Sequence, residues 1–231
     1  MTVYPGRGAW TSVGKDNGAI NYIYIARKPN DGSTPLKSIN HAAVNLGVLA
    51  IQMRINALGY LPTMVQDGDL GPATTKGIKW VQSLFGLVSD GECGPKTCKA
   101  LWLPLISMFE NSYGIPGHHM YGIAMHESLL DPGAVGASTP NDRGLMQWNT
   151  ENSGLSVQQA HDTYYALTKA ASRIRAAQLK YAGKGSTLQT KCSIAQWNAP
   201  AWADQWYTTG SAPNDSITKY VSDVLLAAST F

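Results

Sequence analysis

Apolar positions recur at spacings of three and four residues along much of the chain, and this period predicts a mainly helical protein. The first helical stretch keeps five apolar side chains on one face: Val44, Val48, Ile51, Ile55 and Leu58. Gly59 follows where a helix C-terminal cap belongs. A second helix is expected over 72–85, with these residues inward: Ile78, Val81 and Leu84. The spacing returns in 156–180 and 217–228, so helices should also form the later part of the chain.

An eight-residue pattern occurs twice in the first helical region. The sequence Asp-Gly-Asp-Leu-Gly-Pro-Ala-Thr at 67–74 returns as Asp-Gly-Glu-Cys-Gly-Pro-Lys-Thr at 90–97, so each copy reads DGxxGPxT. Asp-Gly favours a turn, and proline suits the first position of a helix. Each copy follows a glycine-capped helix, at Gly59 and at Gly86, and the second copy opens a third helix at Pro95. The pattern therefore predicts one helix–turn–helix unit used twice over three helices.

The chain before these helices has a different composition. Residues 1–41 are rich in Gly, Pro, Asn and Ser, and only the stretch 20–25 favours a strand. We therefore divide the chain into an irregular segment 1–41, a three-helix domain 42–102 and a second domain 103–231.

Composition and charge exclude several classes of protein. With 44% apolar and 14% charged residues among 231, the chain can build a core and is too weakly charged for disorder. The net charge is +3 and no run of like charges occurs, so the sequence does not predict the basic surface that binds nucleic acid. No stretch reaches the ~18 apolar residues of a membrane span. The start of the chain lacks a secretion signal, so a target outside the cytoplasm would require release by another agent.

A single acidic residue stands on an otherwise apolar helix face. In the segment 120–128 the residues that share this face are Met120, Ile123, Ala124 and Glu127. Burying a charge is costly, so desolvation favours the neutral carboxyl and raises its pKa. A carboxyl that stays protonated near neutral pH is what the general acid of a glycosidase requires. The alternative is a glutamate at a frayed helix end, close to solvent.

Metal and thiol chemistry find little support in the sequence. His126-Glu127 begins like HExxH, but position 130 is leucine, so the second ligand is missing and we expect no metal and no cofactor. A peptidase that uses Cys192 is a further alternative, although a packed thiol suits this position better. Cys93 and Cys98 are close enough in sequence to bridge, and backbone geometry must decide between a bridge and free thiols.

Residues 44–102 resemble the peptidoglycan-binding domain of many wall hydrolases, which is a small three-helix bundle. The matching stretches are 58–61, 67–72, 81–82, 86–88 and 100–102. Cys98 departs from the resemblance because the family usually carries an apolar aromatic side chain there. The repeated motif builds turns and does not spell out a ligand groove, so no binding residues are named for this domain.

Three later segments occur in the order typical of another family. They are Glu127-Ser128, then Gly144-Leu145-Met146-Gln147, and finally Ala195-Gln196-Trp197-Asn198-Ala199. Together they resemble the lytic transglycosylase and goose-type lysozyme superfamily. The resemblance implies a mostly helical, lysozyme-like α+β domain over 103–231, with a cleft between Glu127 and Asn198.

The same resemblance implies a role for each motif residue. Glu127 would be the catalytic acid, and Ser128 would help to hold the substrate or the glutamate. The cleft would be lined by Gly144, Leu145, Met146 and Gln147. Gln147 would bond an acetamido group, for which an amide both donates and accepts, and Asn198 would orient the sugar. Trp197 stands where the family has tyrosine, so it can stack on a sugar but lacks the hydroxyl.

Two routes follow from protonation of the oxygen between N-acetylmuramic acid and N-acetylglucosamine. In a transglycosylase the same carboxylate then accepts a proton from the 6-hydroxyl of the sugar, which gives an anhydro end. In a muramidase a second carboxylate activates water. Asp142 is the better candidate because goose-type enzymes have an aspartate shortly before Gly-Leu-Met-Gln, whereas Glu151 is a weaker one. The alternative role for Asp142 is to stabilise a turn. We expect transglycosylase-like chemistry.

The combination of wall binding and glycan cleavage suits a monomeric, bacteriolytic phage endolysin that reaches the wall through a separate pore. A virion-associated lysin and a bacterial enzyme exported by other means are the alternatives. A chain that binds peptidoglycan without cleaving it, as a wall-binding or virion structural protein, is the non-enzymatic alternative. A zinc amidase that acts on the peptide stem would need the metal ligands that the sequence lacks.

Overall fold

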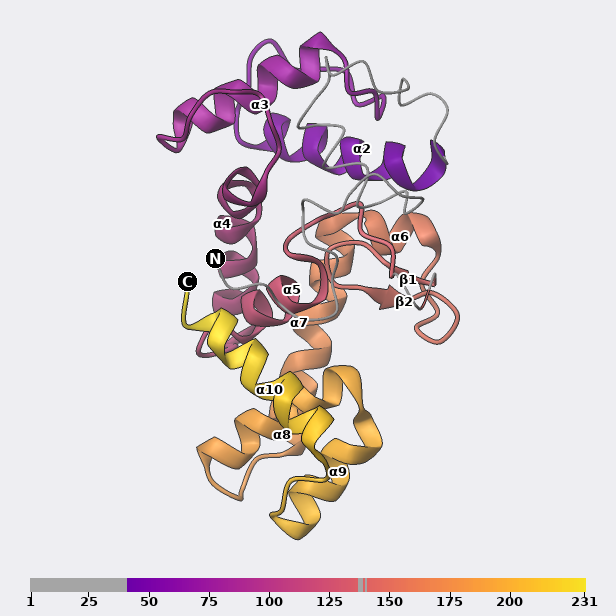
Figure 1. Ribbon diagram of the computed structural model, residues 1–231, viewed down its shortest axis with the longest axis vertical. Helices are drawn as coiled ribbons and strands as arrows, with labels where there is room; N and C mark the ends of the chain where they lie inside the picture. The colour runs from indigo at the N-terminus through magenta and orange to yellow at the C-terminus, as the bar shows by residue number, and fades with distance from the viewer. Residues whose placement is uncertain (1–40, 137–138, 140) are drawn as a thin grey trace. The chain divides into compact units, whose positions relative to one another are not determined.

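The computed structural model describes residues 41–231 except 137, 138 and 140, so the strand expected at 20–25 lies outside the described residues. The described residues form nine helices and one small hairpin, which confirms a mainly α fold (Figure 1). The elements are α2 His41–Ala57, α3 Pro72–Leu84, α4 Pro95–Tyr113, α5 His119–Ser128, β1 Asp142–Arg143, β2 Trp148–Asn149, α6 Val157–His161, α7 Thr163–Lys180, α8 Ser186–Asn198, α9 Pro200–Thr209 and α10 Asp215–Ala228.

The described residues cluster into two compact units. Unit 1 holds the described residues up to Pro104 together with Glu127–Ala166. Unit 2 holds Leu105–His126 and Leu167–Phe231. Three helices, α4, α5 and α7, therefore contribute residues to both units.

Helices α2 and α3 bury the central part of the apolar faces that the spacing predicts, while Leu58 is half-buried and the side chain of Val44 is outside the described ones. Val48, Ile51 and Ile55 of α2 and Ile78 and Val81 of α3 are all inaccessible to solvent. The expectation that Leu84 points inward is wrong, because this side chain is 54% exposed. Leu84 is the last residue of α3, where the buried face of the helix ends and the chain turns toward solvent.

A buried glutamine fastens the first copy of the repeated turn to α2. The Nε2 of Gln52 donates to Asp67 Oδ1 at 2.8 Å and Thr74 Oγ1 at 2.9 Å, and it lies 3.1 Å from the Asp69 carbonyl oxygen. Its Oε1 accepts from the backbone N–H of Gly68 at 2.9 Å. One amide therefore satisfies polar groups at both ends of the turn, which would otherwise be buried without partners.

Gln82 of α3 does the same for the second copy. Its Nε2 contacts Asp90 Oδ1 at 2.6 Å, the Glu92 carbonyl oxygen at 2.9 Å and Thr97 Oγ1 at 3.1 Å. Its Oε1 accepts from the Gly91 N–H at 2.8 Å. The two copies thus share a tertiary hydrogen-bond pattern as well as a sequence.

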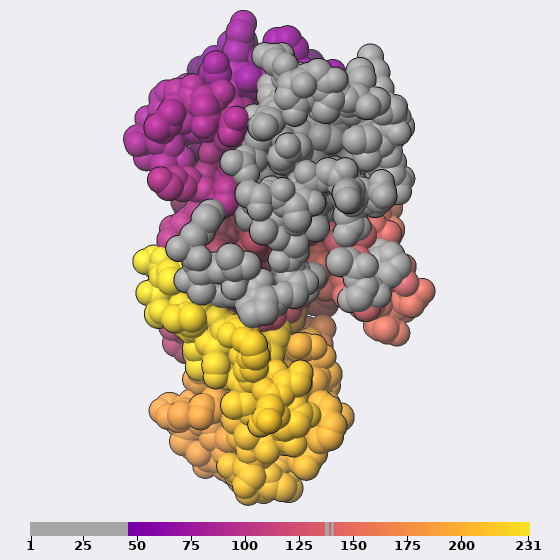
Figure 2. Space-filling view, viewed as in Figure 1, coloured from indigo at the N-terminus to yellow at the C-terminus, as the bar shows by residue number. Residues whose placement is uncertain are grey.

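In unit 2 the helix α10 is strongly amphipathic. Its buried residues recur at helical spacing: Ile217, Tyr220, Val221, Val224, Ala227 and Ala228. Asn214 caps the helix by accepting a hydrogen bond from the N–H of Ile217 at 2.9 Å. The C-terminal residues are yellow in Figure 2, and Leu226 of α10 is exposed. Among the described residues, no helix has both the length and the apolar character that crossing a membrane requires.

We expect Gln82→Leu to destabilise the chain by about 2–4 kcal/mol, because a similar-sized apolar side chain leaves the buried Gly91 N–H without its acceptor and removes the bonds to Asp90, Glu92 and Thr97. Urea unfolding followed by circular dichroism measures the loss. The matched control is Gln66→Leu, because Gln66 is exposed in the same region of the chain. Equal midpoints for the two variants would contradict the role of Gln82 as the centre of the turn.

Candidate functional site

Helix α5 carries Glu127 one residue before its end, and the residue is buried. Met120, Ile123 and Ala124 on the same face are inaccessible, and Glu127 is only 8% exposed. The structure therefore favours the apolar-face interpretation over a glutamate in open solvent.

The start of α5 is capped by a carboxyl from another helix. Glu110 of α4 is 3% exposed, and its Oε1 accepts from the backbone N–H groups of Met120 at 2.9 Å and Tyr121 at 3.1 Å. Its Oε2 lies 3.2 Å from His118 Nδ1. Burial raises the pKa of Glu110, while these hydrogen bonds oppose the shift. An acidic group at this end of a helix satisfies N–H groups and suits the helix dipole.

Helix α10 lies directly against the middle of α5. A Cβ atom on Gly122 would come within 2.4 Å of the Val224 carbonyl oxygen, so only glycine allows this approach. Further along α5, the Nε2 of His126 lies 3.8 Å from Asp223 Oδ2, and its ring meets Tyr220 edge-on at 4.7 Å. The residue that precedes Glu127 is therefore held by α10.

The chain turns sharply after α5 through two strained residues. Leu129 and Leu130 have φ values of 57° and 65°, in the left-handed region that leucine rarely adopts. Such residues cost on the order of 1–3 kcal/mol each and cluster at functional sites. Ser128, just before them, donates its hydroxyl to the Leu145 carbonyl oxygen at 2.7 Å. This bond brings the Glu-Ser pair and the Gly-Leu-Met-Gln segment together.

The Gly-Leu-Met-Gln segment forms the turn between β1 and β2, which pair antiparallel. Gly144 has φ 72°, and a Cβ there would lie 2.1 Å from the Ala160 carbonyl oxygen of α6. Leu145 and Met146 are buried, as expected for packed apolar side chains. Gln147 is also left-handed, at φ 48°, and its Nε2 donates to the Gly144 carbonyl oxygen at 3.0 Å.

Asp142 uses both carboxylate oxygens inside its own loop. Oδ1 accepts from Asn149 Nδ2 at 2.9 Å, and Oδ2 accepts from the Thr139 hydroxyl. Glu151, the other acidic candidate from the sequence, is exposed. The contacts of Asp142 match those of a residue that stabilises a turn.

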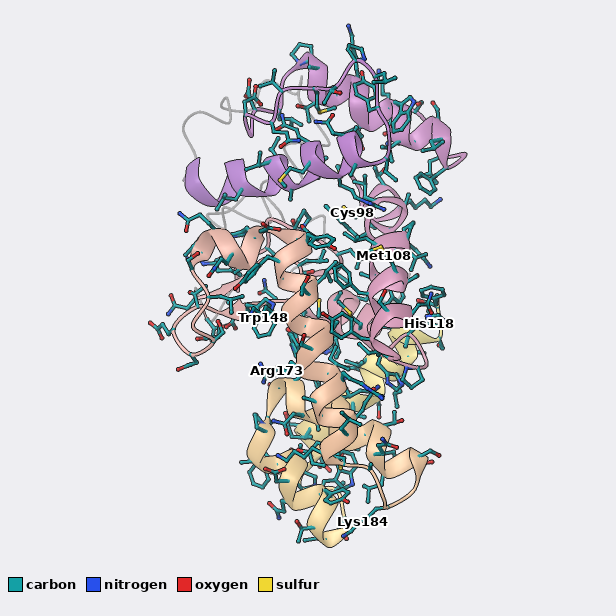
Figure 3. All side chains as sticks on the ribbon, turned by 180° about the vertical axis from the view of Figure 1, so that it is seen from behind. Cys98, Met108, His118, Trp148, Arg173 and Lys184 are labelled. Atoms are coloured by element: carbon teal, nitrogen blue, oxygen red, sulfur yellow. The ribbon has the colours of Figure 1, made fainter. Side chains whose placement is uncertain are left out.

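The third motif ends α8, where an arginine that the sequence did not single out supports it. Arg173 of α7 donates to the carbonyl oxygens of Gln196 and Trp197, both at 3.1 Å (Figure 3). Its guanidinium also lies 4.9 Å from the Trp197 ring centroid. Trp197 is buried and Asn198 is exposed. Arg173 therefore caps the C-terminal end of α8 and fixes the tryptophan.

A pocket of about 440 Å³ opens at the other end of α8, beside Lys184, Lys191 and Trp206. A helix of 13 residues rises ~20 Å along its axis, so this pocket is well separated from Asn198. It is not the place where the motif residues predict sugar binding. Within the described residues, no cluster of three or more histidine, cysteine or acidic side chains could hold a metal ion.

The described residues thus combine a buried glutamate, tied through Ser128 to the hairpin turn, with a repeated three-helix module. Residues 45–101 match the peptidoglycan binding domain family, and residues 104–191 match the Transglycosylase SLT domain family. No curated protein and no solved structure matches the chain. The chain thus carries a peptidoglycan-binding domain followed by a transglycosylase SLT domain, which indicates an enzyme with lytic transglycosylase activity on peptidoglycan. Trp197 and Asn198 lie beyond the matched range.

We expect Gly144→Ala to cost about 2–4 kcal/mol more than Gly154→Ala. Both glycines are left-handed, at φ 72° and 71°, but a Cβ at Gly154 meets nothing within 4 Å. The control therefore carries only the backbone penalty, about 1–2 kcal/mol. Urea unfolding gives both values, and equal losses would show that the hairpin does not press on α6 as described.

A further pair of variants, Asp131→Asn and Asp69→Asn, tests a buried acid in the loop after α5. Burial raises the pKa of Asp131 well above its ordinary value, against one hydrogen bond from the Gly133 N–H that lowers it. An acid whose pKa is raised on folding contributes stability at low pH that is lost as pH rises through the folded value. The melting temperature of the native chain should therefore fall relative to that of Asp131→Asn as pH rises above about 4. Exposed Asp69→Asn should track the native chain, and parallel curves for Asp131→Asn would contradict the shift.

Proposed function

We propose that this enzyme cleaves the β-1,4 bond between N-acetylmuramic acid and N-acetylglucosamine, with Glu127 first as general acid and then as general base. The observation that carries the proposal is a buried glutamate at the end of α5, next to a strained turn and tied through Ser128 to the Gly-Leu-Met-Gln segment. The first step requires a protonated carboxyl at this position.

The proposed reaction needs one carboxyl group. Glu127 gives its proton to the bridging oxygen as the bond from that oxygen to the sugar carbon breaks. The resulting carboxylate then takes the proton of the 6-hydroxyl of the muramic acid, whose oxygen bonds to the same carbon. The products are a free 4-hydroxyl and a 1,6-anhydro end, and Glu127 regains its proton without consumption of water.

The contacts of Asp142 favour this route over hydrolysis. A base that activates water needs a free oxygen directed at the substrate, whereas Asp142 already accepts hydrogen bonds on both oxygens. The alternative is a muramidase in which Asp142 leaves these partners and activates water. The identity of the product separates the two routes.

We propose sugar contacts for the remaining motif residues on the strength of the resemblance. Gln147 would bond an acetamido group, Asn198 would orient the sugar next to the cut, and Trp197 would stack on a sugar face with Arg173 behind it. Ser128 would act chiefly on the protein, because its hydroxyl donates to the Leu145 carbonyl oxygen. Gly144, Leu145 and Met146 would shape the wall beside the glutamate.

We further propose a biological setting, in which the chain is a phage-type endolysin that acts as a monomer on the bacterial wall. The pairing of a wall-binding domain with a glycan-cleaving domain in one chain supports a lytic role. Virion association is the second setting to consider. Addition of the purified chain to permeabilised bacteria tests lytic activity directly.

We expect Glu127→Gln to lower the rate of glycan cleavage by about 10²–10⁴-fold, because the amide keeps the shape and cannot give a proton. Binding to isolated sacculi should stay within twofold of the native chain, since the binding domain is unchanged. Turbidity loss measures cleavage, and sedimentation with sacculi measures binding. Exposed Asp215→Asn is the control. Full lysis by Glu127→Gln would refute the assignment.

Mass spectrometry of the digest should show anhydro-muropeptides, which are lighter by one water than hydrolysed products. Asp142→Asn should keep the anhydro product and lower the rate by less than about tenfold, because its role is in the loop. Hydrolysed products that disappear in Asp142→Asn would favour the muramidase alternative.

A further inference from the structure

Two thiols lie in contact inside the binding module. Cys93 and Cys98 are both inaccessible to solvent, and their Sγ atoms are 3.7 Å apart. Cys93 lies in the second copy of the repeated turn, and Cys98 lies in the first turn of α4 (Figure 3). The contact therefore joins the loop to the helix that follows it.

The repeat shows that the turn itself does not require these cysteines. Aligning the two copies places Leu70 opposite Cys93 and Thr75 opposite Cys98. The glutamine, the aspartates and the threonine that hold both turns are kept, while only the second copy has two thiols. The sulfur pair is thus an addition to a turn that is already complete.

We propose that Cys93 and Cys98 are a crosslinking site that is oxidised to a disulfide when the chain meets a thiol–disulfide oxidant, the reagent class of oxidising compartments. Each cysteine loses its hydrogen and one new Sγ–Sγ bond forms. The two electrons and two protons pass to the disulfide of the oxidant, whose own S–S bond breaks to give two thiols. A disulfide is about 2.0 Å long, so the two sulfur atoms must approach by less than 2 Å.

The closed module protects the pair in either state. Contact with Cys93 and burial raise the pKa of Cys98 well above its ordinary value, and the thiolate is the reactive form. The thiol–disulfide exchange therefore takes place while the chain folds or while the binding module opens. After closure the bond is shielded from reductants, and it ties the turn held by Gln82 to α4. This inference does not depend on the role of Glu127.

The test uses the full chain refolded from denaturant in a glutathione buffer rich in the oxidised form. Lys96 lies between the two cysteines, so trypsin separates them into the peptides 80–96 and 97–99 unless the bond holds them together. We expect the linked pair in at least nine of ten molecules and one alkylatable thiol, Cys192, under denaturing conditions. Three alkylatable thiols, or a bond that includes Cys192, would overturn the proposal.

Stability provides the second measurement. The oxidised chain should melt roughly 5–10 °C above the reduced chain. Cys93→Ser with Cys98→Ala should abolish this difference. Cys192→Ser should keep it, because Cys192 is buried in unit 2 with a pKa that burial raises to about 11. Equal melting temperatures for the oxidised and reduced native chain would also overturn the proposal.

Discussion

A carboxyl held away from water is the constraint on which the SLT-type domain depends, because burying such a group costs free energy that the surrounding framework must offset. Helix α5 is short, yet it is fixed along its whole length. Glu110 caps its start, α10 presses on Gly122, and Ser128 bonds the hairpin turn at its end. A helix fixed in this way can hold a strained turn next to the glutamate, since the contacts over-determine its position.

The peptidoglycan-binding domain also buries polar groups, and it satisfies them with neutral amides. Each DGxxGPxT turn presents backbone and side-chain polar atoms at a buried place, and one glutamine from the preceding helix satisfies them. An amide is suited to this task because it donates and accepts at the same site. Both domains therefore owe their local shape to polar residues that are almost fully enclosed.

Periodicity and turn chemistry predicted the helices α2, α3 and α4 closely, because their signals are local: apolar spacing, capping glycines and proline at the first helical position. Motif spacing also placed Glu127 on a buried face. Glu110 and Arg173 were missed, because each caps a helix other than its own and no local pattern marks them. Leu129 and Leu130 carry no signature of a left-handed turn, and Leu84 shows that spacing alone does not say where a buried face stops.

The hydrogen bonds of Gln82 leave the choice of side chain open at one position of its turn. It reaches the Gly91 N–H and the Glu92 carbonyl oxygen, so at the first variable position of the motif it touches only main chain. Gln52 likewise contacts only the carbonyl oxygen of Asp69. At position 69 the side chain is exposed, so it can be exchanged while the contact of Gln52 with the main chain is kept.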